Sequence, residues 1–365
     1  MDFNINRLVL LDALTKVSRA VSLKSPLPIL TGIKFDLLED GLVLTASDSD
    51  ISIQTTINEG IIINQTGSVV LSSKYILEII RKIDGDTVHI QVVDGTLTRI
   101  TSESSLFDLN GSKSFDFPRI DLNKNGKHFS MKSYAFKKII EKTLFATSEQ
   151  ETRPVLTGVN FKVDQLVCIA TDSYRLAQVS MPIEDDIQFN IVIPKKSLNQ
   201  IIHIIEKDEM IDLYVSDRKV LFVIGQYLVL TRLIDGTYPN TSRLVEDQGS
   251  YTMSINSSAL LGAISRASLL SDEQSNIVKL TMSPDENVLS SYSQEIGSVE
   301  ENLTKAFYKG EPMTISFSAK YLADAIRSIG TETIQLRFTE KMRPFQITGL
   351  DVNDNIQVVL PVRTY

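Results

Sequence analysis

The sequence of 365 residues contains a single cysteine, so an internal disulfide is excluded and a reducing compartment is expected. Cys168 lies in the apolar stretch Leu166–Ala170, which favours a buried side chain over a reactive thiol. No run of 18 apolar residues occurs, so we expect no membrane span. The N-terminus lacks a basic segment followed by an apolar core and a cleavage site, so we expect a cytoplasmic protein.

Residues suited to metal binding or catalysis are also scarce. Of the three histidines, His89 falls within a predicted strand, His128 in a predicted linker and His203 in the middle of a predicted helix. None has a second histidine or a cysteine at the spacing of metal ligands. The sequence has no Walker A loop, no GxGxxG and no GxSxG. We therefore expect no metal, no cofactor and no catalytic residues.

Three aspartates remain as possible catalytic carboxylates. Asp48 and Asp50 lie in the segment SDSD and Asp172 in the segment TDSY, in each case at the end of a predicted strand. Aspartate at such a position usually accepts hydrogen bonds from its own backbone in a turn. We therefore favour a structural role in turns for these residues.

What the sequence does contain is a long internal repeat. The segment PILTGIKF, Pro28–Phe35, recurs as PVLTGVNF, Pro154–Phe161. Behind it, ASDS at Ala46–Ser49 recurs as ATDS at Ala170–Ser173. Self-similarity at a fixed long period shows that the chain is built from repeated units, and this decides the fold.

A second marker shows that the repeat is threefold. Helix-like segments that begin at Ser73, Lys195 and Ala319 resemble one another, and an alternating strand follows each of them. Three units of about 122 residues account for the chain, and a unit of this size can bury a core of its own. We therefore predict three tandem similar domains. Their predicted ranges are 1–122, 128–246 and 250–365.

Each predicted domain holds two copies of a motif with a strand, a helix and a meander of strands. Apolar residues recur at helical spacing along one face of segments 6–22, 132–148 and 257–271, which open the three units. Strands outnumber helices and are joined by short turns, which favours antiparallel sheets. Helices that cover one face of antiparallel sheets define the α+β class, which is the fold class that we predict.

The basic residues are concentrated in the predicted helices. The chain carries a net charge of −8, yet six helical windows sum to +11, with sixteen basic residues against five acidic ones. These windows are 6–22, 73–83, 132–148, 194–207, 257–271 and 318–329. Glutamate forms helices as well as lysine does, so helix propensity alone does not explain the excess. The distribution favours a functional basic surface built by the helices.

Several segments spread over all three units are specific enough to suggest a family. They are LPILTGI (27–33), ETRPVLTGVNF (151–161), ATDSYRLA (170–177), LIDGTYPNTSRL (233–244), RASLLS (266–271), SQEIGSVEE (293–301), MRPF (342–345) and LPVRTY (360–365). Together they resemble the bacterial DNA polymerase III β subunit, the family of DNA sliding clamps. The C-terminal LPVRTY is similar to the Gram-positive branch of that family.

The resemblance implies an assembly and a function. It implies a head-to-tail homodimeric ring in which helices line the hole and sheets form the outer layer. Such a ring would encircle double-stranded DNA without reading its sequence, because phosphate contacts carry no sequence information. The protein would be a processivity factor for DNA replication, would have no catalytic residues of its own and would associate with the nucleoid. Implied partners are the DNA polymerase III α subunit, the clamp loader, other polymerases and repair proteins, with no membrane partner.

The resemblance also carries site residues over to this sequence. The family's DNA-facing positions fall on Lys24, Lys74, Arg81, Gln150, Lys195 and Lys196. Its pocket for a client peptide, with aliphatic walls and an arginine at the rim, falls on Leu156, Thr171, Ser173, Tyr174, Arg175, Leu176, Pro239, Arg243, Leu244, Val359, Leu360, Pro361, Val362 and Arg363. Tyr174 departs from the histidine common at its position. The family's dimer interface falls near Phe107, Leu269 and Leu270.

Two other functions compete with the clamp hypothesis. A repeat-built interaction scaffold would use the pocket around Arg175 and Leu360 without encircling DNA, and it would be a monomer. An enzyme would use the turn aspartates, and the change Asp172→Asn would then abolish turnover without disturbing the fold.

Overall fold

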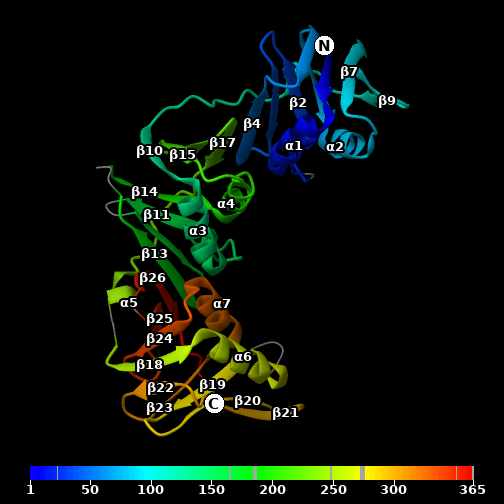
Figure 1. The fold of residues 1–365 in the computed structure, drawn as a ribbon. Helices are drawn as coiled ribbons and strands as arrows, with labels where there is room; N and C mark the ends of the chain where they lie inside the picture. Colours follow the sequence, from blue (N-terminus) through cyan, green and yellow to red (C-terminus); the bar gives the residue numbers. More distant parts are fainter. Residues whose placement is uncertain are drawn as a thin grey trace. The chain divides into compact units, whose positions relative to one another are not determined.

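The computed structural model describes residues 1–22, 24–163, 166–183, 187–246, 249–271, 276–350 and 352–363. The chain divides into two compact units (Figure 1). Unit 1 comprises Met1–Lys137 and Lys196–Leu233, and unit 2 comprises Lys138–Lys195 and Ile234–Tyr365. Each unit therefore contains part of the second predicted domain, together with the whole of the first or the third.

Unit 1 contains two antiparallel sheets. The five-stranded sheet has the order β5 (Ile61–Gln65), β1 (Asp2–Asn6), β7 (Thr87–Asp94), β8 (Leu97–Ser102) and β9 (Ser105–Asn110). The eight-stranded sheet has the order β10 (Lys127–Lys132), β15 (Met210–Val215), β16 (Lys219–Ile224), β17 (Tyr227–Arg232), β4 (Ile51–Ile57), β3 (Leu42–Ser47), β2 (Gly32–Leu37) and β6 (Gly67–Ser72).

Unit 2 repeats this plan. The nine-stranded sheet has the order β14 (Phe189–Pro194), β11 (Gly158–Val163), β12 (Leu166–Thr171), β13 (Arg175–Met181), β26 (Val352–Val359), β25 (Phe345–Gly349), β24 (Thr333–Phe338), β18 (Tyr251–Asn256) and β22 (Phe307–Lys309). The four-stranded sheet has the order β21 (Gly297–Asn302), β20 (Asn287–Ser293), β19 (Ile277–Met282) and β23 (Met313–Ser318).

Except for the short α5, the helices of the described residues lie where the apolar periodicity predicts them. The structure places α1 at Arg7–Val17, α2 at Ser73–Lys82, α3 at Ser133–Thr143, α4 at Lys195–Ile202, α5 at Ser242–Glu246, α6 at Ser257–Ala267 and α7 at Ala319–Ile329. Three of them end earlier than predicted, because a 3-10 turn continues the chain at Ser18–Ala20, Leu144–Ala146 and Ser268–Leu270. The α+β class with antiparallel sheets is confirmed.

The N-termini of α1 and α6 are capped in the same way. The side-chain oxygen of Asn6 accepts hydrogen bonds from the amides of Leu8 and Val9, and that of Asn256 accepts one from the amide of Ala259. An asparagine cap satisfies amides that have no partner within the helix. The repeated strand–asparagine–helix sequence therefore sets where each helix begins.

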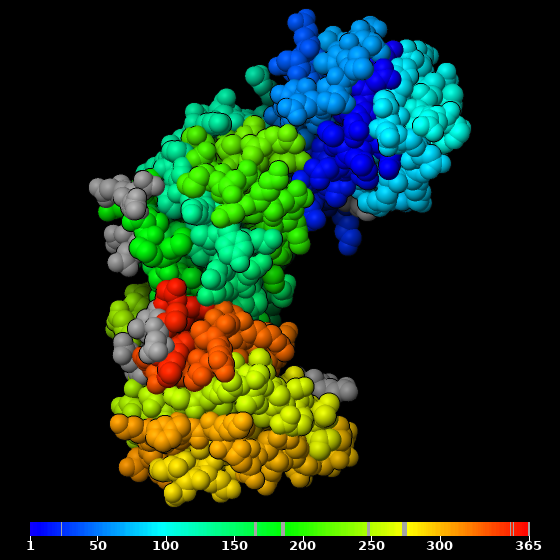
Figure 2. Space-filling view, in the orientation of Figure 1, coloured from blue at the N-terminus to red at the C-terminus, as the bar shows by residue number. Residues whose placement is uncertain are grey.

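A helix pair covers the sheets in the first and third repeats. In unit 1, α1 packs on α2 and touches β1, β3 and β4. In unit 2, α6 packs on α7, α6 touches β18, β20 and β21, and α7 touches β23, β25 and β26. In Figure 2 the red surface of β26 adjoins the orange surface of α7. The buried faces of the helices supply core residues such as Leu10, Leu14, Leu260 and Leu322.

The repeated glycine in the LTG segments has a packing cause. A Cβ atom on Gly32 would lie 2.9 Å from the carbonyl oxygen of Leu71, and one on Gly158 would lie 2.5 Å from that of Ile193. Only glycine lets the first residue of β2 and of β11 approach the neighbouring strand so closely. The internal repeat therefore marks the same strand pairing in two domains.

Two sheets cross the predicted domain boundaries. Strand β4 of the first repeat pairs antiparallel with β17 of the second, and β13 of the second repeat pairs antiparallel with β26 of the third. The register places Ile53 opposite Val229 and Ala177 opposite Gln357. Neighbouring repeats are therefore joined through backbone hydrogen bonds as well as by the linkers.

Two local expectations were wrong. His203 lies just beyond α4, which ends at Ile202, because the helix closes in a turn in which the amide of His203 bonds the carbonyl of Gln200. His128 lies in β10, where it pairs with Tyr214 of β15, and so it is not in a linker. His89 lies in β7 as predicted.

Candidate functional site

The turn between β12 and β13 is built around the carboxylate of Asp172. Its Oδ1 accepts hydrogen bonds from the amides of Tyr174 and Arg175, each at 3.0 Å. The hydroxyl of Thr171 donates to the carbonyl of Arg175 at 2.6 Å, and Ser173 adopts a left-handed φ of 77°. These bonds confirm the predicted turn role of Asp172 and hold Tyr174 exposed at the tip.

The same turn recurs between β3 and β4. The Oδ1 of Asp48 accepts from the amides of Asp50 at 3.0 Å and Ile51 at 2.9 Å, and Ser49 has a φ of 85°. The side chain of Asp48 is 3% exposed and forms an ion pair with Lys196 of α4. The side chains of Asp48 and Asp172 thus hold backbone as predicted, whereas Asp50 is exposed and contributes its amide to the turn.

Arg175, one of the three arginines carried over to the pocket, is a buried junction residue. It is 8% exposed, because its guanidinium is enclosed by groups from several elements. Its Nε donates to Asp172 at 3.0 Å and its Nη1 to Asp324 of α7 at 2.8 Å, while Nη2 donates to the carbonyl of Phe145 at 2.7 Å. The ring of Tyr321 lies 4.5 Å from the guanidinium carbon. Arg175 therefore ties the turn to α7.

The C-terminal stretch is attached beside this turn. Val359 pairs with Arg175 at the end of β26, and the amide of Leu360 donates to the carbonyl of Tyr174 at 3.0 Å. The amide of Val362 donates to the carbonyl of Ser316 at 2.7 Å. Of the remaining predicted pocket residues here, Leu176 is buried, Leu360, Pro361 and Val362 are half-buried, and Arg363 is exposed.

A small apolar cluster supplies a second part of the predicted pocket. Leu156 packs with Val192 and Tyr238, and all three side chains are buried. Tyr238 was absent from the predicted site, although it directly precedes Pro239 in the segment that carries the resemblance. Burial raises the pKa of the Tyr238 phenol. We define the docking patch as the β12–β13 turn at 172–174, the C-terminal stretch 359–363 and the cluster of Leu156, Val192 and Tyr238.

Helix α5 lies against the same strands. Arg243 and Pro239 are exposed and Leu244 is half-buried. The side-chain amide of Gln346 in β25 donates to the carbonyls of Leu244 and Val245, each at 2.9 Å, and α5 touches β26. The sequence analysis assigned no helix to this short segment, because five residues carry too little periodicity. Arg243 therefore reaches solvent, as Arg363 of the C-terminal stretch does.

The predicted DNA-facing residues differ in exposure and in whether their charges are paired with a carboxylate. Lys24, Lys74 and Arg81 are exposed, and so is the amide Gln150. Arg81 is paired with Glu78 of its own helix, Lys195 with Glu149, and Lys196 with Asp48. Only Lys24 and Lys74, among these cations in the described part of the chain, have no carboxylate within ion-pair distance.

One lysine of the basic helical windows is not at the surface at all. The Nζ of Lys16 lies 2.9 Å from Asp12 and 2.8 Å from Glu206, and the residue is 7% exposed. Burial alone would lower the pKa of Lys16, but the hydrogen bonds to Glu206 and Asp12 outweigh it and the pKa is raised. Counting charges along the sequence therefore overstates the basic surface.

Comparison with known proteins places this geometry in a family. Models of the DNA polymerase III beta subunit match the chain as its N-terminal domain over residues 1–121, its central domain over 130–240 and its C-terminal domain over 243–363. The beta sliding clamp of Bacillus subtilis (strain 168) is 39% identical over 378 residues, and 100% of both chains is covered. The chain belongs to the DNA polymerase III β-subunit family.

Solved structures agree with this assignment. The crystal structure of the DNA polymerase sliding clamp from Bacillus subtilis has a TM-score of 0.96 and 39% identity, with 100% of each chain covered. The β subunit from Streptococcus pyogenes has a TM-score of 0.95 and 32% identity, again with 100% of each chain covered. The general role of this β-subunit family member is therefore that of a polymerase clamp, and its similarity to Gram-positive relatives is confirmed.

In this family member the predicted dimer-interface residues lie at two sheet edges. Phe107 is 39% exposed on β9, which pairs only with β8 among the described residues. Leu269 is 75% exposed and Leu270 half-buried in the 3-10 turn that touches β21. Strand β21 pairs only with β20 in the described ranges. Each site thus combines an exposed apolar side chain with an open strand edge.

Three further observations concern metal binding, membrane spans and the single cysteine. No group of three or more histidine, cysteine, aspartate or glutamate side chains is placed to hold a metal ion within the described ranges. No helix in the described part of the chain is sufficiently long and apolar to span a membrane. Cys168 is fully buried, and burial raises the pKa of its thiol, as the predicted core position requires.

Proposed function

We propose that this chain is the subunit of a head-to-tail homodimeric ring that encircles duplex DNA and tethers the replicative polymerase to it. The proposal rests on the family membership and on one structural observation, the two open sheet edges. Its three domains correspond to the predicted ranges 1–122, 128–246 and 250–365. It acts as a processivity factor without catalytic chemistry of its own, because its turn aspartates are committed to holding backbone.

The repeat explains why the open edges are significant. Within the chain, the junction strands β17 and β26 end the meanders β15-β16-β17 and β24-β25-β26, and β9 ends the equivalent meander β7-β8-β9. Strand β17 pairs with β4, and β26 pairs with β13. Strand β21, which lies beside β20 and β19, has the same position in the third repeat as β4 has in the first and β13 in the second. Pairing β9 of one copy with β21 of another therefore continues the same rule, and two such contacts close a ring. The apolar side chains of Phe107 and Leu269 would be covered by that contact.

In this proposal the surface for DNA is supplied by α2, α4 and the segments that follow the 3-10 turns Ser18–Ala20 and Leu144–Ala146. Lys24 and Lys74 are exposed cations that can meet phosphates directly, whereas Arg81, Lys195 and Lys196 already have carboxylate partners. Weak contacts to the phosphate backbone carry no sequence information and can be exchanged as the ring slides. Gln150 adds a neutral polar contact to this surface.

The docking patch supplies the partner-binding surface. Its apolar members Leu156, Leu360 and Val362 suit an apolar side chain of a linear motif, and Arg243 is an exposed cation beside them. Tyr174 stacks on Tyr321 with ring centroids 6.5 Å apart, so an aromatic face borders the patch. The polymerase α subunit, the clamp loader and repair proteins would dock here in turn.

The dimer is tested by charging each edge separately. Phe107→Asp and Leu269→Asp change exposed side chains, so the fold should persist while sedimentation equilibrium shows a monomer. Leu38→Asp, at a side chain that is 49% exposed in the β2–β3 turn, is the matched control and should remain dimeric. A monomeric unmodified protein, or dimeric edge variants, would contradict the proposed contact.

The ring is tested by topology. Protein loaded on nicked circular DNA should stay bound when salt is raised, and cutting the circle once should release it. An open binder with roughly six phosphate contacts would instead lose on the order of 10³ in affinity between about 50 and about 200 mM salt. Equal loss from circles and linear fragments would leave only a scaffold function for the docking patch.

A further inference from the structure

A strap of chain crosses the polar face of the eight-stranded sheet in unit 1. We define the strap as residues 111–123, which follow β9 and lead toward β10. Near its start, Ser112 exchanges backbone hydrogen bonds with Val70, and Phe117 is buried against Leu30 and Val70. Near its end, Asp121 accepts from Lys219 at 2.7 Å. The strap is therefore pinned at several points along its length.

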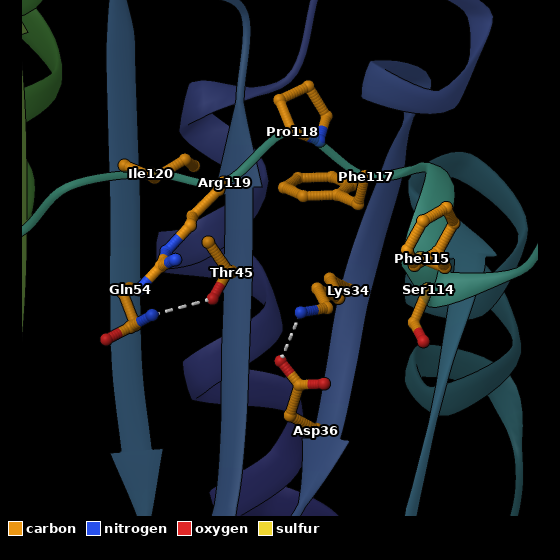
Figure 3. Close-up of a pocket in the computed structure, with 10 residues that line it drawn as sticks. All are labelled: Lys34, Asp36, Thr45, Gln54, Ser114, Phe115, Phe117, Pro118, Arg119 and Ile120. Carbon is orange, nitrogen blue, oxygen red and sulfur yellow. Dashed lines mark hydrogen bonds and ion pairs between the residues drawn. The ribbon is translucent and has the colours of Figure 1, made fainter.

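Between its attachment points the strap leaves a hollow of 460 Å³ over the sheet (Figure 3). The floor is polar and its groups are already paired. Lys34 and Asp36 of β2 form an ion pair at 2.9 Å, and the side-chain amide of Gln54 donates to the hydroxyl of Thr45 at 2.9 Å. The floor thus contributes no net charge to the hollow.

Among the charged side chains that line this hollow, Arg119 is the one outside the Lys34–Asp36 ion pair. It is exposed, and in the part of the chain that the structure describes no carboxylate lies within ion-pair distance of it. Figure 3 shows its side chain reaching from the strap toward Gln54. Arg119 and Gln54 also line a second hollow of 640 Å³, together with Leu122 and Leu228. One unpaired guanidinium therefore borders two adjoining hollows.

An exposed aromatic side chain lies beside the first hollow. Phe115 is 94% exposed and lines the hollow from the strap, next to Ser114. Phe117, only two residues along, is buried at 7%, so the strap holds one phenylalanine inward and offers the other to solvent. Figure 3 shows Phe115 and Arg119 at opposite ends of the hollow with Phe117 between them, so a peptide that lies along the strap can place an apolar side chain on the ring and a carboxylate at the guanidinium.

We propose that this groove is a second docking site, separate from the docking patch, and that it takes an acidic linear peptide. An apolar side chain of the peptide packs on Phe115, and a carboxylate farther along the peptide receives the two N–H groups of the Arg119 fork. Arg119 borders a hollow whose floor carries no net charge, so an anionic group is the complement of its guanidinium.

The charges around the groove favour a peptide over a nucleic acid. Asp116 is exposed on the strap itself, between Phe115 and Arg119 in the sequence. A continuous run of phosphates along the strap would meet this carboxylate, whereas a peptide can place a single carboxylate at Arg119. The groove also lies on a sheet face, on elements distinct from the predicted DNA-facing helices α2 and α4.

The proposal is tested with a reporter at the site itself. Trifluoromethylphenylalanine placed at position 115 of the full-length protein is followed by fluorine NMR. The probes are the blocked hexapeptides GLFEEG and GLFKKG, titrated to millimolar concentration. A saturable shift is expected with GLFEEG, and binding of GLFKKG should be about fivefold weaker, as expected for an exposed ion pair.

Variants separate this site from general charge effects. Arg119→Glu should reverse the preference so that GLFKKG binds better. Arg218→Glu makes the same charge change on an exposed turn of the same unit and should leave the preference unchanged. Equal affinity for both peptides, no saturation, an unchanged preference in Arg119→Glu, or tighter binding of a hexathymidine oligonucleotide would each overturn the proposal.

Discussion

The buried guanidinium of Arg175 should be the main determinant of stability where β13 meets β26. Its side chain is 10% exposed and the Asp324 side chain that it pairs with is 22% exposed. Replacing Arg175 by methionine keeps an unbranched apolar stem but removes the guanidinium, which leaves the carbonyl of Phe145 and the Oδ2 of Asp324 without their donor. Arg327 stays 3.3 Å from the Oδ1 of Asp324. Breaking a buried pair from one side costs about 3 kcal/mol or more. We therefore expect Arg175→Met to destabilise this junction by about 3 kcal/mol.

The loss should be local, so a local measurement is the right one. A chain of several domains does not unfold in a single two-state step, and a global midpoint would blur the effect. Native-state hydrogen exchange of the amides across the β13–β26 pairing should speed up by about a hundredfold, since each 1.4 kcal/mol is tenfold. Amides of the five-stranded sheet in unit 1 should keep their exchange rates.

Two further variants make the reasoning refutable. Asp324→Asn retains an acceptor for Arg175 and should cost about half as much, in the range of about 1–2 kcal/mol. Arg343→Met removes an exposed arginine, 69% accessible and 4.0 Å from Glu340, and should change the exchange by less than about 0.5 kcal/mol. If Arg175→Met behaved like Arg343→Met, the guanidinium would not hold the junction together.

Three other outcomes follow from the described contacts. Lys196→Met should lower the free energy of unfolding of unit 1 by about 1–2 kcal/mol, measured by hydrogen exchange, because it strips a charged donor from the buried carboxylate of Asp48. Cys168 should react with a thiol reagent only at the rate of unfolding, since burial raises its pKa and shields it. A hydrogen bond from Ser130 lowers the pKa of Asp212, so the stability that it contributes is present above the ordinary value of 3.8 and is lost as pH falls below it. Acid titration of Asp212→Asn should therefore show a shallower loss of stability below about pH 4 than the unmodified protein does.

Much of the fold follows from local sequence patterns. Apolar residues at helical spacing located six helices, and their asparagine or serine caps fix where α1, α6 and α7 begin. The repeated aspartate turns were predicted because aspartate accepts bonds from amides two and three residues ahead, which is a local effect. Helix caps and aspartate turns join residues that are close in the sequence, so they can be predicted without knowing how the rest of the chain folds.

The pairing of strands between repeats could not be predicted from the same patterns. Whether β4 meets β17 depends on two edges that lie far apart in the sequence, and alternation of apolar residues does not say which edges meet. The burial of Arg175 was missed for the same reason, because Asp324 lies 149 residues away. The resemblance indicated that Arg175 belongs to the site, and only the structure shows that it faces inward.

The two junctions pair their turn aspartates with cations from different places, and this changes which lysines are unpaired on the proposed DNA surface. Each turn aspartate needs a cation. Arg175 supplies it within the same turn at the second junction, whereas the first turn has Ile51 at that position and borrows Lys196 from α4. Because Arg175 already pairs with Asp172, no pairing with a turn aspartate is required of Lys320, the counterpart of Lys196 in α7. Lys320 is exposed, with no carboxylate at ion-pair distance among the described residues. The charge of Lys320 in α7 is therefore unpaired, whereas the charge of Lys196 in α4 is paired with Asp48.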